Sequence, residues 1–329
     1  MLFGYSNAFY DSASIYELNT INQKVYIKEV LNELSSILPE FYSYRIYFLC
    51  ATAGITPHSI KDPYKKKILI QWEDQLGTEP SKEVMSSYLC VFKTHLRKRS
   101  ETFKNLYSYP LGIPYKIKEL PIVPINERKY DIFYSGNLNK NRYNFFSSLV
   151  YIKPSFRKLI ILPILYIASK FEYNTKLRNT SLRLKSLAFK LKATNFDDVF
   201  KNSIIKFTRS FEAGLPPEQY AEILSQSKIV LSPKGFFNTE CFRFYEALRQ
   251  GCIVITEKLP ETDYYNNKYF IEVKSWRNID KIINSLLSNK ENLKRMSLQG
   301  REYYQKELSP KGVATYLKNK ILSNENGTK

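Results

Sequence analysis

Short apolar runs alternate with helix-like patterns along most of the chain. The runs of strand length are rich in β-branched or aromatic residues and bounded by polar clusters, and they lie at 43–52, 66–72, 87–94, 203–210, 228–233 and 252–256. This pattern is typical of buried strands. Residues 129–142 read as a further strand that runs into a glycine loop.

Helical spacing fills the intervals between these runs. Apolar residues recur at helical steps in 22–38, 216–227, 239–250, 279–287 and twice within 290–322. Strands that alternate with helices predict parallel sheets covered on both faces. The expected fold class is therefore α/β.

A segment without periodicity separates the two halves of the chain. Residues 111–127 hold three prolines and have the composition of a linker. A chain of 329 residues suits about two domains. We expect domains at 1–125 and 126–329, the second of which contains a basic helical segment at 151–206.

Positive charge is concentrated in that basic segment. The formal net charge of the chain is +19, and residues 151–206 hold twelve Lys and Arg against three acidic residues, a net of 12 − 3 = +9. An excess of this kind indicates an anionic partner such as nucleic acid, a membrane surface or a phosphorylated ligand. Compositional drift is the alternative, but drift does not predict clustering.

The same segment contains apolar stretches of two kinds. The run at 159–171 is too short to cross a bilayer and contains Pro163. Residues 182–193 place four apolar side chains on one helical face with basic residues around it, as in a helix that lies on a membrane surface: Leu184, Leu187, Ala188 and Leu191. An ordinary helix whose leucines face the core has the same pattern.

Cysteine usage and the first residues set an expectation for the compartment. The four cysteines form no CxxC pair and no zinc-binding spacing. The first residues show neither the basic start nor the apolar core of a signal peptide. We expect reduced thiols and a cytoplasmic protein.

Residues 231–256 place charged side chains between two expected strands. After the first strand come Lys234 and Gly235, and a helix is expected from about Thr239 to Gln250 with Asn238 or Thr239 as its cap. Open α/β sheets bind ligands at the carboxyl ends of their strands, and the free amides of a helix start favour phosphate. A lysine adds positive charge there, and a glycine lets the backbone approach closely.

Arg243 and Glu246 fall on one face of that helix. An arginine offers paired donors that suit a diphosphate, and a carboxylate one turn further on can accept from the vicinal hydroxyls of a ribose. Phosphate donors followed by a carboxylate indicate a nucleotide diphosphate site. A solvated helical ion pair with no ligand is the alternative.

Two segments of the second half resemble a known family. Residues 220–255, "YAEILSQSKIVLSPKGFFNTECFRFYEALRQGCIVI", and residues 130–142, "YDIFYSGNLNKNR", are similar to the C-terminal domain of GT-B glycosyltransferases of the exostosin-type branch. The resemblance implies two Rossmann-like domains facing across a cleft. The domain at 1–125 would then serve the acceptor and the domain at 126–329 would bind the nucleotide sugar.

The resemblance also implies roles for particular residues. Glu246 would hold the ribose, while Arg243, Lys234 and the amides after Gly235 would face the diphosphate. The loop within residues 129–142 would line the site with Gly136, Asn137 and Arg142. Arg209 would be a further phosphate or base contact. Many family members carry a second glutamate eight residues before the one that corresponds to Glu246. In this chain that position is Asn238. Glu240 is the nearest replacement.

Glycosyl transfer with inversion needs a base for the acceptor hydroxyl and positive charge for the leaving group. Glu73 and Asp74 follow a strand of the first half and are the candidate bases, with His95 as the other candidate. The resemblance implies no metal and no other cofactor.

The expected function is transfer of a sugar to a glycan acceptor, lipid-linked, in capsule or lipopolysaccharide synthesis. The protein would act in the cytoplasm, peripheral on an anionic membrane surface, without a nucleic-acid partner. A basic nucleic-acid-binding protein is an alternative, although no RNP, helix-turn-helix or zinc-finger motif is present. A catalytically inactive GT-B scaffold is another.

Overall fold

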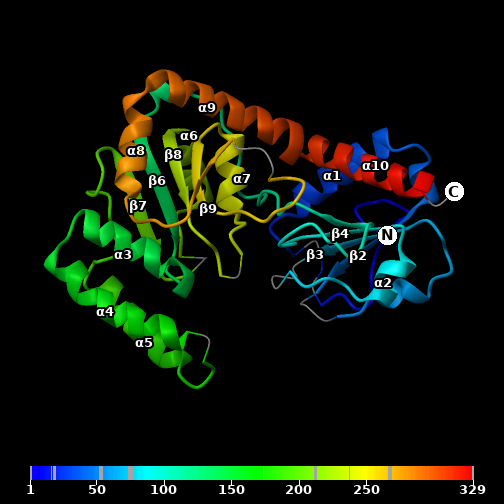
Figure 1. Ribbon diagram of the computed structural model, residues 1–329, viewed down its shortest axis with the longest axis horizontal. Coiled ribbons are helices and arrows are strands. Elements are labelled where there is room, and N and C mark those ends of the chain that lie inside the picture. Colours follow the sequence, from blue (N-terminus) through cyan, green and yellow to red (C-terminus); the bar gives the residue numbers. More distant parts are fainter. Residues whose placement is uncertain are drawn as a thin grey trace. The chain divides into compact units, whose positions relative to one another are not determined.

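The chain folds into two compact units in a computed structural model, which describes residues 2–15, 17, 20–51, 55–72, 77–172, 174–210, 213–236, 238–265 and 269–327 (Figure 1). Unit 1 comprises Met1–Lys116, Leu259–Lys268 and Glu302–Lys329, and unit 2 comprises Ile117–Lys258 and Tyr269–Arg301. Each unit contains one five-stranded sheet whose strands are all parallel. The two parallel sheets confirm the predicted α/β class.

The division of the chain differs from the sequence-based one at the C-terminal end. The last helix, α10 (Pro310–Gly327), packs along α1 (Lys24–Ile37) and so belongs to unit 1. The Tyr44 hydroxyl donates to Glu325 at 2.7 Å, and the Tyr26 hydroxyl donates to the Leu308 carbonyl at 2.7 Å. Helical periodicity shows that a segment has an apolar face but not which sheet that face covers, so this return of the chain is not visible in the sequence.

The sheet of unit 1 has its strands in sequential order, β1-β2-β3-β4-β5. Its regular elements besides α1 and α10 are β1 (Ala8–Tyr10), β2 (Arg45–Cys50), β3 (Lys67–Trp72), α2 (Lys82–Ser87), β4 (Cys90–Lys93) and β5 (Leu106–Ser108). The strands predicted at 43–52, 66–72 and 87–94 correspond to β2, β3 and β4. Strands β2, β3 and β4 are almost entirely buried, which explains their continuous apolar character.

Unit 2 has the strand order β7-β6-β8-β9-β10. Its strands are β6 (Tyr130–Asn137), β7 (Ser203–Thr208), β8 (Ser227–Ser232), β9 (Ile253–Glu257) and β10 (Ile271–Val273). The chain starts at β6, moves outward to β7 and then crosses back to β8. The strand order therefore reverses between β6 and β8, and the carboxyl ends of these two strands are the expected ligand-binding edge of such a sheet.

Helices cover both faces of this sheet. They are α3 (Tyr143–Ile152), α4 (Phe156–Phe171), α5 (Arg178–Lys190), α6 (Pro217–Ser225), α7 (Phe242–Arg249), α8 (Ile279–Ser288) and α9 (Lys290–Tyr303). Successive residues of β6 face opposite sides: Tyr134 joins a core with α3 and α8, while Phe133 contacts Tyr220 of α6 at a ring distance of 5.2 Å.

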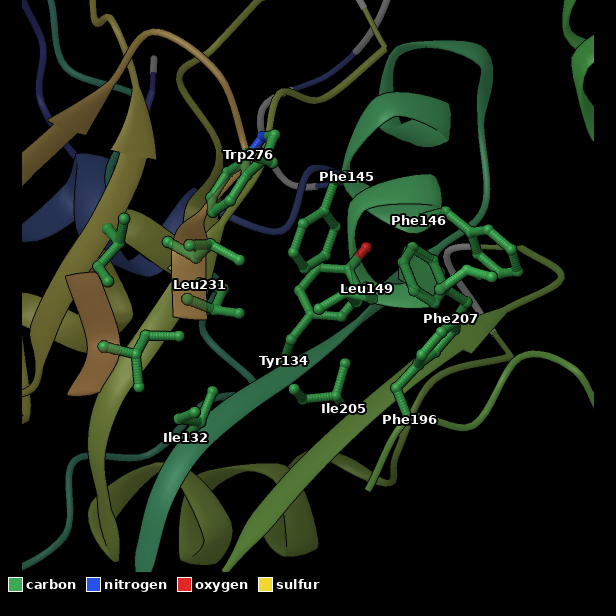
Figure 2. Packing of buried hydrophobic residues seen from close by; sticks show 14 of the residues in the cluster. Ile132, Tyr134, Phe145, Phe146, Leu149, Phe196, Ile205, Phe207, Leu231 and Trp276 are labelled. Carbon is green, nitrogen blue, oxygen red and sulfur yellow. The ribbon is translucent and has the colours of Figure 1, made fainter. Parts of the chain in front are cut away.

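Aromatic side chains form the centre of the first of these two cores (Figure 2). The Tyr134 ring lies 4.9 Å from that of Phe145 on α3 and 5.0 Å from that of Phe207 on β7. Phe145 in turn contacts Trp276, which follows β10, at 4.6 Å. These edge-on and tilted contacts fix Tyr134 in one position near the carboxyl end of β6.

Within the described ranges, every helix is too short or too polar to cross a membrane. The apolar run at 159–171 belongs to α4, which has 16 residues.

A partly buried carboxylate, Asp62, joins several side chains of unit 1. Asp62 Oδ2 accepts from Arg45 at 2.5 Å and from the Tyr47 hydroxyl. Asp62 Oδ1 accepts from the Tyr64 amide at 2.9 Å. Burial alone would raise the pKa of Asp62, but these hydrogen bonds hold the pKa at about 2, below the ordinary 3.8. The folded state therefore favours the ionised form.

We predict that Asp62→Asn lowers the free energy of unfolding by about 1–2 kcal/mol at pH 7, since Arg45 leaves the pair partly solvated. The stabilising effect of a depressed carboxyl pKa is present above about pH 4 and is lost as the pH falls toward 2. Urea titrations at pH 7, 4 and 2 measure the difference. Glu33→Gln, on the outer part of α1, is the control, and a deficit for Asp62→Asn that persists unchanged at pH 2 would contradict the prediction.

Candidate active site

The loops that follow β6 and β8 are joined at the point where the strand order reverses. Arg142 donates through Nη1 to the Asn137 carbonyl at 2.8 Å and to the Asn137 side chain, and through Nε to the Lys234 carbonyl at 3.1 Å. Asn141 donates to the carbonyls of Gly235 and Phe236 at 2.9 and 2.5 Å. The two loops thus form one rigid edge, built largely from residues that the sequence places in a donor site.

Arg243 lies behind this edge with most of its hydrogen-bonding capacity unused. Its Nη2 donates to the Ser135 carbonyl, and its guanidinium carbon lies 4.8 Å from the centre of the Tyr134 ring. The residue is 8% exposed, and both Nε and Nη1 are buried without a hydrogen-bond partner among the described residues. A buried donor without an acceptor costs free energy, so this arrangement requires an explanation beyond packing.

Gly136 is required by the close approach of two arginines. A Cβ at this position would lie 2.6 Å from Nη2 of Arg243 and 3.1 Å from Nη1 of Arg142. Only glycine leaves room for both guanidinium groups at the end of β6. Gly136, Asn137, Arg142, Lys234, Gly235 and Arg243 are therefore brought together by the fold.

Glu246 lies one turn further along α7 and is 5% exposed. Its Oε2 accepts from the Tyr220 hydroxyl of α6 at 2.7 Å. Burial raises the pKa of Glu246, while the Tyr220 hydroxyl, Arg243 and Arg249 act in the opposite direction. The interpretation of Arg243 and Glu246 as a solvated surface pair is wrong, because both side chains are buried.

The segment between β8 and α7 differs from the sequence prediction in detail. Helix α7 begins at Phe242 rather than near Thr239, its N-cap is Cys241, and no side chain caps it. The predicted caps serve other roles: the Asn238 carbonyl accepts from the Gly235 amide at 2.9 Å, and Thr239 lines a cavity. Glu240 is buried and accepts from the Tyr245 hydroxyl at 3.3 Å.

A cavity of about 1080 Å³ opens beside this edge, within unit 2. It is bounded by the loops after β6 and β8, by the residues that follow β9 and β10, and by one side of α3. Its basic lining residues are Lys140, Lys234, Lys258, Lys274 and Arg277. Two carboxylates, Glu257 and Asp280, also line it, so the cations exceed the anions by 5 − 2 = 3. This excess gives the cavity a positive potential that suits an anionic ligand.

Other predicted residues lie outside this arrangement. Arg209 is exposed at the end of β7 and stacks on Phe189 of α5, 5.4 Å from its ring centre. His95 follows β4 in unit 1, is 9% exposed and has a left-handed backbone (φ 59°). Glu73 and Asp74 lie outside the described residues. In the described part of the chain, no three His, Cys, Asp or Glu side chains form a group that could hold a metal ion.

Sequence reasoning missed three residues that shape the site. Tyr220 binds Glu246, Tyr134 supports Arg243, and Asn141 joins the two loops. Tyr220 opens the stretch that resembles the family, but its contact crosses from α6 to α7. The hydrophobic period of one helix does not show which residue of another helix it contacts.

Comparison with known proteins gives one match to a family model. Residues 185–309 match the model described as RXYLT1 C-terminal domain, which is an exostosin-like glycosyltransferase family. This range contains α6, β8, α7 and β9 but not β6. No curated protein matches the chain.

Several solved structures are similar in architecture. An α-glucosyltransferase in complex with UDP and a 13-mer DNA containing a HMU base has a TM-score of 0.47 and 10% identity, over 90% of this chain and 84% of that chain. A glycosyltransferase from Rickettsia africae has a TM-score of 0.47 and 13% identity, over 94% and 84%. Sucrose-phosphate synthase from Thermosynechococcus elongatus has a TM-score of 0.47 and 11% identity, over 97% and 83%.

We predict that Glu246→Gln raises the free energy of unfolding at pH 7. A carboxyl whose pKa is raised on folding binds its proton more tightly in the native state, so stability falls as the pH rises from the unfolded pKa of about 4.3 through the folded pKa. Glutamine avoids that loss and keeps an acceptor for Tyr220. Denaturant titrations between pH 4 and 8 should show a gain that disappears near pH 4.

Glu222→Gln, on the exposed side of α6, is the matched control and should show no such pH-dependent gain. A deficit of Glu246→Gln that grows between pH 4 and 8 would show that the native state stabilises the carboxylate, against the prediction.

Proposed function

We propose that the protein is a GT-B type glycosyltransferase that moves a sugar from a nucleotide-diphosphate donor to a glycan acceptor. The observation that supports this proposal best is the buried Arg243 at the point of strand-order reversal, with Glu246 buried one turn further on. Two donor atoms of Arg243 have no partner among the residues that the structure describes. The match of residues 185–309 to an exostosin-like family model agrees with the proposal.

The diphosphate of the donor would supply acceptors for Nε and Nη1 of Arg243, which have none among the described residues. A phosphate group presents several oxygens to a guanidinium and suits its paired donors. Lys234 and the amides after Gly235 would add positive charge on the side of the cavity, and Gly136 leaves room for the approach. Because Nε and Nη1 of Arg243 are buried, this contact requires a shift of the groups that cover them.

The ribose of the donor would bind at Glu246. Tyr220 occupies one carboxylate oxygen, and Oε1 has no hydrogen bond to any described residue. That oxygen can accept from a hydroxyl. Asn137, Arg142, Asn238, Thr239 and Glu240 would shape the loops around the nucleotide and its sugar, and Arg209 would contribute a further contact from β7.

The transfer itself would invert the configuration of the sugar without a metal. The acceptor hydroxyl attacks the anomeric carbon, the bond from that carbon to the diphosphate oxygen breaks, and a base takes the hydroxyl proton. Asp74, Glu73 or His95 of unit 1 would be the base. The negative charge that develops on the diphosphate would be stabilised by Arg243, Lys234 and the amides.

The acceptor would be a lipid-linked glycan of capsule or lipopolysaccharide synthesis. The protein would work in the cytoplasm on the inner face of the membrane, where a basic protein meets anionic lipid. The supporting observations are the net charge of +19 and its concentration in 151–206.

We predict that a thermal-shift screen of UDP-, GDP-, CMP- and dTDP-sugars identifies a nucleotide-diphosphate sugar that stabilises the protein. A ligand at a hundred times its Kd adds about 2.7 kcal/mol. Arg243→Ala and Glu246→Ala should each weaken binding roughly tenfold or more, because each loses a charged hydrogen bond to the ligand.

Arg295→Ala, on the exposed side of α9, should bind as tightly as the unmodified protein. Equal affinity in all three variants would contradict the placement of the donor. A protein that ignores every sugar nucleotide but binds arbitrary DNA with a steep salt dependence would favour the nucleic-acid alternative.

A further inference from the structure

Exposed apolar side chains gather on one segment of unit 2. Of the 17 large hydrophobic residues that are exposed in the described part of the chain, ten lie between Tyr151 and Leu191, on or next to α3, α4 and α5. Helices α4 and α5 lie side by side and project from the body of unit 2 (Figure 1). A soluble surface rarely concentrates apolar residues in this way without a binding role.

Helix α4 carries five of these ten residues and presents four of them, together with Pro163, as a continuous stripe. The stripe residues recur at helical steps along its outer side: Phe156, Leu159, Ile160, Pro163 and Ile167. Phe156 is 79% exposed, more than any other residue among them. The opposite side of α4, with Ile161, Leu165 and Ala168, is buried in the core. At about 1.5 Å per residue, the stripe runs along a helix of about 24 Å.

Helix α5, on which the sequence allows either an interfacial or an internal apolar face, contributes Leu182 and Leu187 to these ten residues, against five from α4. Ala188 is fully buried in the core of unit 2, and Leu187 and Leu191 are only 36% and 39% exposed. The apolar face expected on α5 is thus divided between internal packing and the surface, and α4 carries the longer exposed stripe.

Positive charge surrounds the stripe. Some basic residues of 151–206 are neutralised within the protein: Lys158 and Lys153 bind Asp198, Lys185 binds Glu172 at 2.6 Å, and Lys206 binds Asp197. The others are exposed and have no carboxylate partner among the described residues: Arg157, Lys170, Lys176, Arg178, Arg183, Lys190, Lys192 and Lys201. Arg157 and Lys170 lie on α4 itself, and Lys170 stacks on Tyr166 at 4.4 Å.

The stripe borders the cavity beside the candidate active site. Tyr166 and Ser169 of α4 line that cavity, and Tyr166 is next to Ile167 of the stripe. Tyr151 lines it from the end of α3 and is 72% exposed. A molecule held at the stripe is therefore close to the mouth of the cavity.

We propose that the α4 stripe docks on an anionic lipid bilayer, with Phe156 and the neighbouring apolar residues in the interface and the exposed basic residues on the lipid headgroups. A helix with an apolar face and basic residues around it lies in the plane of such an interface. This inference rests on the proposed function in one respect: docking would bring the cavity to a lipid-linked acceptor.

The charge distribution favours a bilayer over other occupants. A second copy of this chain would bring the same unpaired cations against each other, which is unfavourable. A nucleic acid would use the cations, but its backbone contacts would not require a stripe of aliphatic and aromatic side chains. Anionic lipid satisfies both features at once.

Vesicle co-sedimentation of the full chain tests this inference. The protein should bind vesicles of phosphatidylcholine with phosphatidylglycerol and bind pure phosphatidylcholine vesicles much more weakly. The double variant Phe156→Ser/Ile160→Ser should reduce partitioning roughly tenfold or more, because it removes apolar groups from the interface. Arg157→Ala/Lys170→Ala should also reduce it, by roughly 25-fold, since each of the two charges near the surface contributes about a fivefold effect.

Matched control variants lie on α9, at the other end of unit 2 from α4 and α5 (Figure 1). Leu298→Ser removes an apolar residue that is 53% exposed, and Lys290→Ala/Lys294→Ala removes two exposed charges. Both should bind vesicles like the unmodified protein. Circular dichroism melts of all variants establish that each is folded.

The outcomes separate this inference from the proposed function. Loss of vesicle binding in the stripe variant, with an unchanged thermal shift by the sugar nucleotide, supports docking through α4. Vesicle binding without any sugar-nucleotide shift leaves docking standing and removes the proposed function. Vesicle binding that the stripe variant does not change overturns the docking proposal. The proposal is also overturned if the unmodified protein does not bind vesicles and is a dimer in light scattering, while the stripe variant is a monomer. A second copy of the chain would then cover the stripe.

Discussion

Arg243 packs against the Tyr134 ring between the ends of β6 and β8, and the candidate site depends on this contact. The aromatic core formed with Phe145 and Phe207 fixes the tyrosine, so it also fixes where the guanidinium can lie. Gly136 supplies the space. Unit 2 therefore holds a positive charge in its interior, with two donor atoms that no described residue satisfies, a cost that a structural role alone does not offset. An anion that accepts from these donors would offset it.

Much of the fold follows from local patterns, and the parts that do not are informative. The central strands β2, β3, β4, β8 and β9 were predictable because burial on both faces makes them largely apolar, and β6 was predictable from its apolar middle. The edge strands β1, β5 and β10 were not, because three residues are too few to show a period. The return of α10 to unit 1 depends on packing between distant segments, which no window of sequence contains.

The candidate site was predictable to the extent that its residues are adjacent in sequence. Arg243, Glu246, Lys234 and Gly235 belong to one strand–loop–helix segment, so their common position follows from the order of the elements. Tyr220 and Asn141 reach the site from other elements, and only the three-dimensional structure shows them. The same limit applies to the proposed membrane surface: the basic segment was evident, but whether α4 or α5 turns its apolar side outward is decided by packing.

The most direct test of the central claim is the preference for a diphosphate over a monophosphate, measured by titration calorimetry. For the nucleotide whose sugar conjugate binds, the 5′-diphosphate and 5′-monophosphate are compared in the unmodified protein and in Arg243→Ala. The account predicts that the unmodified protein binds the diphosphate roughly tenfold or more tightly than the monophosphate, a difference of about 1.4 kcal/mol. In Arg243→Ala the ratio of the two Kd values should fall close to one. An equal preference in both proteins would contradict it, because Arg243 would then not bind the diphosphate.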